Sequence, residues 1–305
     1  MTVEITSPAV ATHERAMFAI LCFVWGTTWL AMKVGIATVP PGFFAGTRWT
    51  VAGLALLLYR ALRGHTLAVP FRLLARLILC SVLLVSANQV IQLYGLRNIT
   101  AGLAAVLSSA LTPIGLLGFA VLLRQEVFRW QQGAAMALGV VGIGVLFGPK
   151  ALQGELHVPE VAGAFAVICG TLCYALGSVL ARPLMRTMPP AHVAAMTNFI
   201  GGVILLTGSL MFEPGALAAT TGGWGWPAVA AWLYLLIPGS LFATVIYFLL
   251  VRDWGASRAG TYAFISPIVA VVLGAALFGE IVRPSDVIGM ILMLAAAGMV
   301  LRIKR

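Results

Sequence analysis

The chain alternates between long apolar runs and short polar gaps. A helix needs about 20 mostly apolar residues to cross a bilayer, and ten runs approach or reach this length. They span residues 16–34, 43–62, 73–94, 101–123, 131–148, 160–181, 191–212, 228–250, 258–278 and 286–302. The longest gaps, 63–72, 149–159 and 213–227, are too short for a soluble domain. The pattern predicts an all-α polytopic membrane protein with ten transmembrane helices.

Composition excludes a soluble protein. Of the 305 residues, 61% are hydrophobic and 9% are charged, whereas soluble domains average about 45–50% and about 25%. A soluble fold of this size cannot bury so much apolar surface. We therefore expect the lipid bilayer as the surrounding medium. Because lipid itself demands an apolar exterior, the composition does not distinguish a monomer from a homodimer.

The distribution of charge predicts the orientation in the membrane. The net charge is +10, but the basic residues lie in the gaps between apolar runs and form no cluster, so we expect no nucleic-acid partner. With a cytoplasmic N-terminus, 14 of the 19 Lys and Arg residues fall on the cytoplasmic side. Cytoplasmic loops are enriched in such residues. We expect an integral, multi-pass protein of the cytoplasmic (inner) membrane with both termini in the cytoplasm.

The chain repeats itself at a shift of 154 residues. At this shift Pro113 falls on Pro267 and Glu126 on Glu280, so a proline is followed thirteen residues later by a glutamate in both halves. The sequence therefore predicts two five-helix repeats, residues 1–150 and 151–305. Since five is odd, the second repeat is expected to be inverted, as in many secondary transporters.

These residues resemble a known family. The stretch from Trp25 to Lys33, WGTTWLAMK, the pair Arg48-Trp49 soon after Pro40-Pro41, and the repeated proline and glutamate are similar to EamA-type members of the drug/metabolite transporter (DMT) superfamily. The resemblance implies ten helices, cytoplasmic termini and export of small metabolites, often amino acids. The amino-acid exporter branch is a plausible relative.

Polar side chains within the apolar runs are the candidate binding residues, because such groups face the protein interior or water. Asn88, Gln89 and Gln92 need partners that lipid does not offer, and we expect them to line a cavity or to form a polar network. A single Ser or Thr has an alternative role, bonding the carbonyl four residues back. The candidate substrate-binding residues are Trp25, Thr28, Trp29, Asn88, Gln92, Ser108, Thr112, Tyr174, Ser240, Thr244, Tyr247, Tyr262 and Ser266.

Three prolines interrupt apolar runs. Pro113 and Pro267 each remove a helix hydrogen bond, and they are candidates for a symmetric pair of hinges or for simple packing kinks. Pro238, which precedes Gly239 in the eighth run, marks a further weak point and has no counterpart in the third run.

The charged residues restrict the substrate. No Asp or Glu lies near the centre of a run, which argues against a strongly cationic substrate and favours a neutral or zwitterionic one. Lys33 and Arg48 flank the first external turn. We interpret them as snorkelling to the membrane surface; the alternative is attraction of a substrate carboxylate at an outer vestibule. Glu126 and Glu280 are expected to tie helix ends.

The sequence thus predicts a secondary transporter that exports small amphipathic metabolites, in the first place neutral or aromatic amino acids, by alternating access. The alternatives are an exporter of other metabolites or drugs, or a passive solute channel. An enzyme is not expected: there is no HExxH or GxSxG motif, and the histidines lie in the tail, in loops or at the start of a run. We expect no catalytic residues, no metal site and no cofactor. The partners are the small-molecule substrate and the bilayer.

Overall fold

A computed structural model describes residues 8–151, 158–278 and 283–303, and its regular secondary structure is entirely helical in these ranges. The first half contains α1 Pro8–Gly35, α2 Pro41–Leu62, α3 Phe71–Ser81, η1 Val82–Ala87, α4 Asn88–Asn98, α5 Ala101–Leu122 and α6 Trp130–Ala151. The second half contains α7 Val158–Ala181, η2 Arg182–Arg186, α8 Pro190–Phe212, η3 Ala218–Thr221, α9 Trp226–Tyr234, η4 Leu235–Ala243, α10 Thr244–Trp254, α11 Ala256–Ala259, α12 Tyr262–Phe278 and α13 Pro284–Arg302.

Each predicted apolar run coincides with a helix or with a continuous series of helical segments. Within the described ranges, eight segments are long and apolar enough to cross a membrane. Neither α2 nor α6 is among these eight. In α2, Arg48 and Arg60 lower the mean apolarity. The protein is therefore an all-helical polytopic membrane protein, and ten spans remain a prediction.

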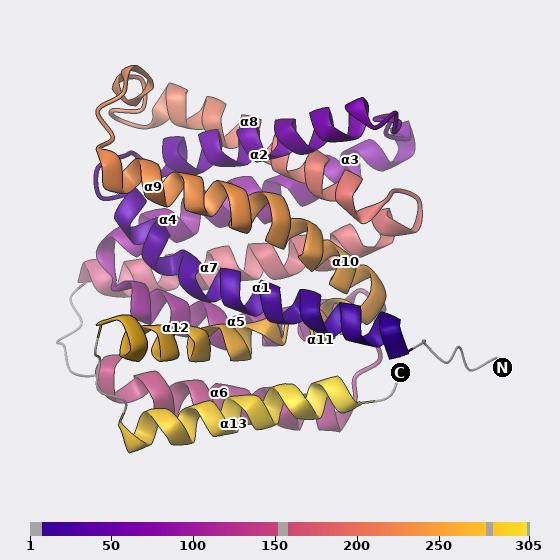
Figure 1. Cartoon of the computed structure of the whole chain (residues 1–305), viewed down its shortest axis with the longest axis vertical. Coiled ribbons are helices and arrows are strands. Elements are labelled where there is room, and N and C mark those ends of the chain that lie inside the picture. The colour runs from indigo at the N-terminus through magenta and orange to yellow at the C-terminus, as the bar shows by residue number, and fades with distance from the viewer. Residues whose placement is uncertain (1–7, 152–157, 279–282, 304–305) are drawn as a thin grey trace.

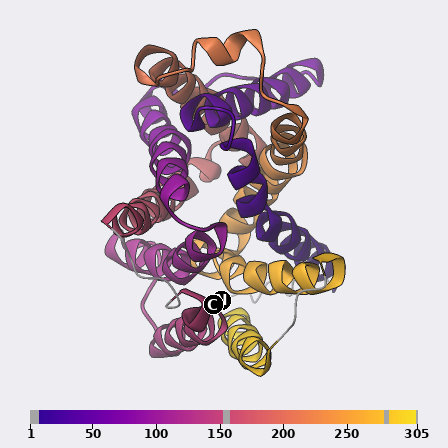
Figure 2. The ribbon, with the colours of Figure 1, turned by 90° about the vertical axis from the view of Figure 1, so that its left-hand side faces the viewer.

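The helices lie side by side along one direction (Figure 1), so the bundle has two ends. The start of α1 and the end of α13 lie at the same end, which we call the terminal end. At one edge of the bundle α2 packs against α8, and at the other edge α6 packs against α13. Figure 2 shows this order in cross-section, with α5 and α12 next to the α6–α13 pair.

Glycines allow α2 and α8 to approach closely. A Cβ atom on Gly53 would lie 2.2 Å from the backbone nitrogen of Phe199, and one on Gly202 would lie 2.3 Å from that of Thr50. Neither contact is compatible with a side chain. Small residues commonly allow such backbone contact between membrane helices. This packing fixes the position of α2, which carries Arg48.

Two helices contain π-helical segments halfway along their length. η1 interrupts the continuous helix of α3 and α4, and η4 interrupts that of α9 and α10. η4 contains Pro238, which has no backbone N–H to continue the α-helical hydrogen-bond pattern. η1 contains no proline, but it lies in the third apolar run and is π-helical, as η4 is. The expectation that the third run has no counterpart to the weak point at Pro238 is therefore wrong for the backbone geometry. π-Helical turns often occur at functional sites.

The apolar core consists of several clusters with a polar region between two of them. One cluster includes Leu21, Leu184 and Leu250, and a second includes Phe44 and Leu96. Trp49 packs against both clusters. The polar side chains near Trp49 form the candidate site described next.

Candidate functional site: a polar and aromatic cavity

A cavity of about 140 Å³ lies among the helices of the bundle. Its walls come from α1, α2, η1, α4, α5, α7, α8, η4, α10 and α12. Both halves of the chain therefore contribute. None of the described residues of α6 or α13 lines it.

One wall is a cluster of four aromatic rings. The Trp25 ring centroid lies 4.7 Å from that of Tyr262, 5.1 Å from that of Tyr247 and 6.2 Å from that of Tyr174. The hydroxyl of Tyr262 donates to that of Tyr174 over 3.4 Å. Edge-to-face and tilted pairs of this kind are favourable. The cluster joins α1 of the first half to α7, α10 and α12 of the second half and offers an apolar surface with hydroxyl groups.

A second wall carries amides and hydroxyls. The Gln92 amide donates to Thr171 Oγ1 over 3.1 Å, and the Asn198 amide donates to the Ser240 carbonyl over 3.2 Å. The Asn88 amide nitrogen donates to the Leu84 carbonyl over 3.1 Å. Among the described residues, Asn88 Oδ1 is buried without a hydrogen-bond partner. A buried acceptor of this kind normally has a hydrogen-bond donor as partner.

The structure brings almost all of the predicted binding residues together. The cavity is lined by Trp25, Thr28, Trp29, Asn88, Gln92, Ser108, Thr112, Tyr174, Thr244, Tyr247, Tyr262 and Ser266. Ser240 lies behind the wall, fully buried, and contacts Arg48. Their shared location is therefore a structural fact, whereas substrate binding by these residues stays a prediction.

The back-bonding alternative holds for several hydroxyls. Thr171 and Ser178 each donate to the carbonyl four residues back, over 2.8 Å. Ser240 and Thr244 instead donate to the carbonyls of Leu235 and Gly239, five residues back. This longer step follows from the π-helical geometry of η4. The wider turn thus satisfies hydroxyls that an α-helix would pair differently.

Arg48 does not snorkel, and that interpretation was wrong. Its side chain is only 4% exposed and lines the cavity. One terminal nitrogen donates to Ser240 Oγ over 2.9 Å and the other to Gln89 Oε1 over 2.7 Å. The guanidinium lies 4.6 Å from the centroid of the Trp49 ring. α2 begins at Pro41, so Arg48 lies about 10 Å along the helix, and its partners draw the side chain inward.

Lys33 ties two helix ends. Its ammonium donates to the carbonyls of Leu96 and Ile99, over 2.5 and 2.8 Å, at the end of α4. Unpaired carbonyls at a helix end favour a cation. Lys33 is absent from the cavity wall, and its contacts support a structural role.

The proline hinges stay a prediction. Pro113 and Pro267 lie inside α5 and α12, which continue through them as α-helices. The residues before them, Thr112 and Ser266, line the cavity. The departures from α-helical geometry occur instead in η1 and η4.

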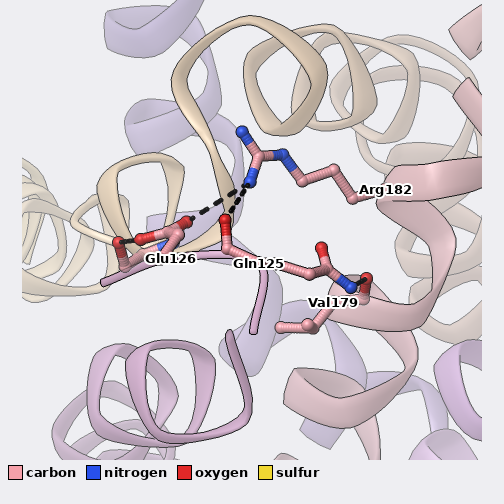
Figure 3. Close-up of polar contacts among 5 residues, drawn as sticks. Gln125, Glu126, Val179 and Arg182 are labelled. Carbon is pink, nitrogen blue, oxygen red and sulfur yellow. Dashed lines mark hydrogen bonds and ion pairs between the residues drawn. The ribbon is translucent and has the colours of Figure 1, made fainter. Parts of the chain in front are cut away.

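Glu126 ties the two halves at the terminal end. It forms an ion pair with Arg182 at 3.9 Å and accepts a hydrogen bond from the hydroxyl of Ser257. Figure 3 shows Gln125 beside it, with the Gln125 amide donating to the Val179 carbonyl over 2.8 Å. The expectation that Glu126 ties helix ends is thereby confirmed, while Glu280 lies outside the described residues.

Glu213 makes the corresponding tie at the opposite end. Its carboxylate accepts the backbone N–H groups of Gly42 and Phe43 over 3.1 and 3.0 Å, at the start of α2, and the Tyr94 hydroxyl over 2.8 Å. A carboxylate at a helix N-terminus is favourable. Among the described residues, Glu126 at the terminal end and Glu213 at the opposite end thus each join the first half to the second.

Sequence reasoning missed part of the cavity. Thr197 and Asn198 in α8 line it, as do Ser109 in α5 and the ring of Trp49. The signal for α8 was present, because Asn198 is an amide in the middle of an apolar run, as Asn88 is. Among the described residues no three His, Cys, Asp or Glu side chains gather as a metal site would require.

An all-helical membrane protein with a polar cavity among its helices has the architecture of a solute transporter. Comparison with known proteins identifies the class. The model of the EamA-like transporter family matches the chain twice, at residues 15–148 and 161–302. The chain belongs to this family, as the resemblance in the sequence predicted, and is a membrane transporter.

Individual relatives agree with this assignment. The chain is 33% identical to the "Uncharacterized inner membrane transporter YedA" of Escherichia coli (strain K12), over 87% of this chain and 82% of the relative. It is 28% identical to "Protein PecM" of Dickeya dadantii, over 90% and 87%. A crystal structure with 19% identity matches with a TM-score of 0.75 and covers 96% of this chain and 99% of the other. That likeness supports the fold alone.

Proposed function

We propose that the protein exports small amphipathic metabolites, in the first place neutral or aromatic amino acids, across the cytoplasmic (inner) membrane by alternating access. The observation that carries the proposal is the cavity built from both halves, with aromatic rings on one wall and amides and hydroxyls on another. Such a lining suits a solute with a polar head and an apolar side chain. The name of the YedA relative supports the membrane assignment.

The proposal includes ten spans arranged as two inverted repeats, residues 1–150 and 151–305, with both termini in the cytoplasm. Two features support it. The family model matches once on each side of residue 150. The packing is also reciprocal: α1 packs on α12 as α7 packs on α5, and α2 packs on its counterpart α8 as α6 packs on α13. Related contacts of this kind are expected when two similar units face each other.

Counterflow in proteoliposomes tests the function. The vesicles are loaded with an unlabelled amino-acid mixture, and uptake of labelled threonine, methionine and phenylalanine is followed with and without a pH gradient. We expect uptake above that of protein-free vesicles, with stimulation by the solute loaded inside. A carrier shows such trans-stimulation and a passive channel does not. The difference between the two gradient conditions measures coupling to protons.

Two results would count against the proposal. Uptake that is insensitive to the loaded solute would indicate a channel. Absence of uptake for all three amino acids, from protein shown by size-exclusion chromatography to be folded, would redirect the search to other metabolites or drugs.

Ala substitutions at Asn88, Tyr247 and Tyr262 should each reduce counterflow, since these side chains form the cavity walls.

A further inference from the structure

Arg48 places a buried positive charge in the wall of the cavity. The residue is 4% exposed, and its recorded hydrogen-bond acceptors, Ser240 Oγ and Gln89 Oε1, are both neutral. The ring of Trp49 adds a cation–π contact. Within the described part of the chain, no carboxylate pairs with this guanidinium. A charge at such depth is costly unless it is compensated by an opposite charge.

The guanidinium also has donors to spare. An arginine carries five N–H groups in a planar fork, and the contacts to Ser240 and Gln89 occupy one on each terminal nitrogen. Nε is buried without a hydrogen-bond partner among the described residues. The remaining donors have the fork geometry that binds a carboxylate in bidentate fashion.

A second buried polar atom without a partner belongs to another residue of the cavity wall. Asn88 precedes Gln89 directly in the chain, lines the same cavity and has a buried Oδ1 without a partner in the described structure. Its amide nitrogen is already bonded to the Leu84 carbonyl. Two residues of the cavity wall therefore carry polar atoms without partners, donors at Arg48 and an acceptor at Asn88, and these complement a carboxylate and an ammonium group.

We propose that Arg48 binds the carboxylate of the transported solute and that Asn88 Oδ1 accepts a hydrogen bond from its ammonium group. The inference rests on the proposed function and names the residues that recognise the two charged groups of an α-amino acid. Ser240 of η4 and Gln89 of α4 hold the guanidinium from opposite halves of the chain. The aromatic rings of Trp25, Tyr174 and Tyr247 then provide the wall for the apolar side chain.

The wild-type protein tests the inference with three compounds that share one phenyl group. Phenylalanine, 3-phenylpropionate and phenylalaninamide compete against labelled phenylalanine in counterflow, and their binding is also followed by quenching of tryptophan fluorescence. We expect phenylalanine to bind best. 3-Phenylpropionate, which lacks the ammonium, should bind more weakly, and phenylalaninamide, which lacks the carboxylate, should lose about ten- to a hundredfold.

Substitutions then assign the effect to the residue. Arg48→Gln should abolish the preference for the acid over the amide, whereas Arg48→Lys keeps the charge and should retain the preference at weaker affinity. Arg60→Gln is the matched control, since Arg60 is a second buried arginine of α2 that bonds His192 and is absent from the cavity wall. It should keep the wild-type preference. A purely structural role of Arg48 would reduce all ligands equally.

The outcomes separate this inference from the proposed function. Transport of phenylalanine with equal affinity for its amide would overturn the role of Arg48 and leave the amino-acid exporter intact. Binding of 3-phenylpropionate that depends on Arg48, without transport of any amino acid, would keep the carboxylate site and overturn the exporter assignment. Absence of binding for all three compounds would overturn both. If Arg48→Gln does not fold, the wild-type series and Arg48→Lys decide.

Discussion

Gln89 accepts a hydrogen bond from the Arg48 guanidinium. Gln89→Glu replaces this neutral amide by a carboxylate of the same shape. Gln89→Glu would place a built-in anion at the 2.7 Å contact with the guanidinium. We expect affinity for phenylalanine to fall about ten- to a hundredfold, since the new carboxylate competes for the same donors. The thermal midpoint should not fall, because the charge is paired. Both values are measurable on purified protein.

Gln92→Glu provides the comparison for this prediction. Gln92 lies on the same helix and lines the same cavity, but its amide contacts Thr171 rather than Arg48. A carboxylate there would be buried without a cation, so Gln92→Glu should lower the thermal midpoint. If both substitutions lowered the thermal midpoint by the same amount, the carboxylate at position 89 would gain no stabilisation from pairing with Arg48, which would contradict the prediction.

At the residue scale, the sequence showed which polar residues must lie inside the protein, but not in which direction a long basic side chain extends. Amides such as Asn88 inside an apolar run have no alternative to the interior, and their position could be predicted. Arg48 was misassigned because a long basic side chain two turns inside a helix can extend either to the membrane surface or into the protein. Its direction depends on Ser240 and Gln89, which belong to distant parts of the chain.

At the scale of the elements, the α2–α8 contact depends on the absence of side chains. Gly53→Val would place a Cβ atom 2.2 Å from the backbone of Phe199, and a relaxed structure should lose about 1–3 kcal/mol of stability. The measurement is the thermal midpoint in detergent. Gly208→Val is the control, since a Cβ on Gly208 of α8 meets no atom within 4 Å. A similar midpoint for both variants would contradict the close packing.

The helices themselves follow from sequence, but their irregularities do not. Apolar length predicts the positions of the membrane helices, and prolines begin α2 and α8 at Pro41 and Pro190. Pro238 marks a missing backbone hydrogen bond at η4, although Pro113 and Pro267 lie inside helices that stay α-helical. η1 has no such marker, since no proline lies within it. Its Ser86 hydroxyl instead donates to the Gly201 carbonyl of α8 over 2.8 Å. Tertiary contacts, invisible in the local sequence, accompany the wider turn.

At the scale of the whole molecule, the two glutamates act at opposite ends. Glu126 joins the halves at the terminal end and Glu213 joins them at the other. Glu126→Gln weakens the first tie and should raise access to the cavity from the terminal end. Glu213→Gln should raise access from the opposite end. Labelling of a cysteine placed at Ala263, a cavity residue, with a membrane-impermeant reagent in oriented vesicles measures both.

The comparison of the two variants is the control for this prediction, because both remove one negative charge from a turn. An increase of labelling from the same side in both variants would show general loosening of the bundle and contradict separate ties. The sequence predicted that Glu126 ties helix ends, because the residue lies at the turn after an apolar run. It did not predict that of Glu213, because no repeat or motif marks this residue and its partners in α2 and α4 are distant in the chain.

The two π-helical segments also affect which changes of chain length the fold can absorb. A π-helical turn holds more residues than an α-helical one, so the loss of one residue within Val82–Ala87 or Leu235–Ala243 can be met by a return to ordinary α-helix. The same loss elsewhere in these helices would rotate everything beyond it by about 100°. Asn88 and Tyr247 would then leave the cavity. Single-residue deletions accepted during the divergence of such transporters should therefore concentrate in these two short stretches.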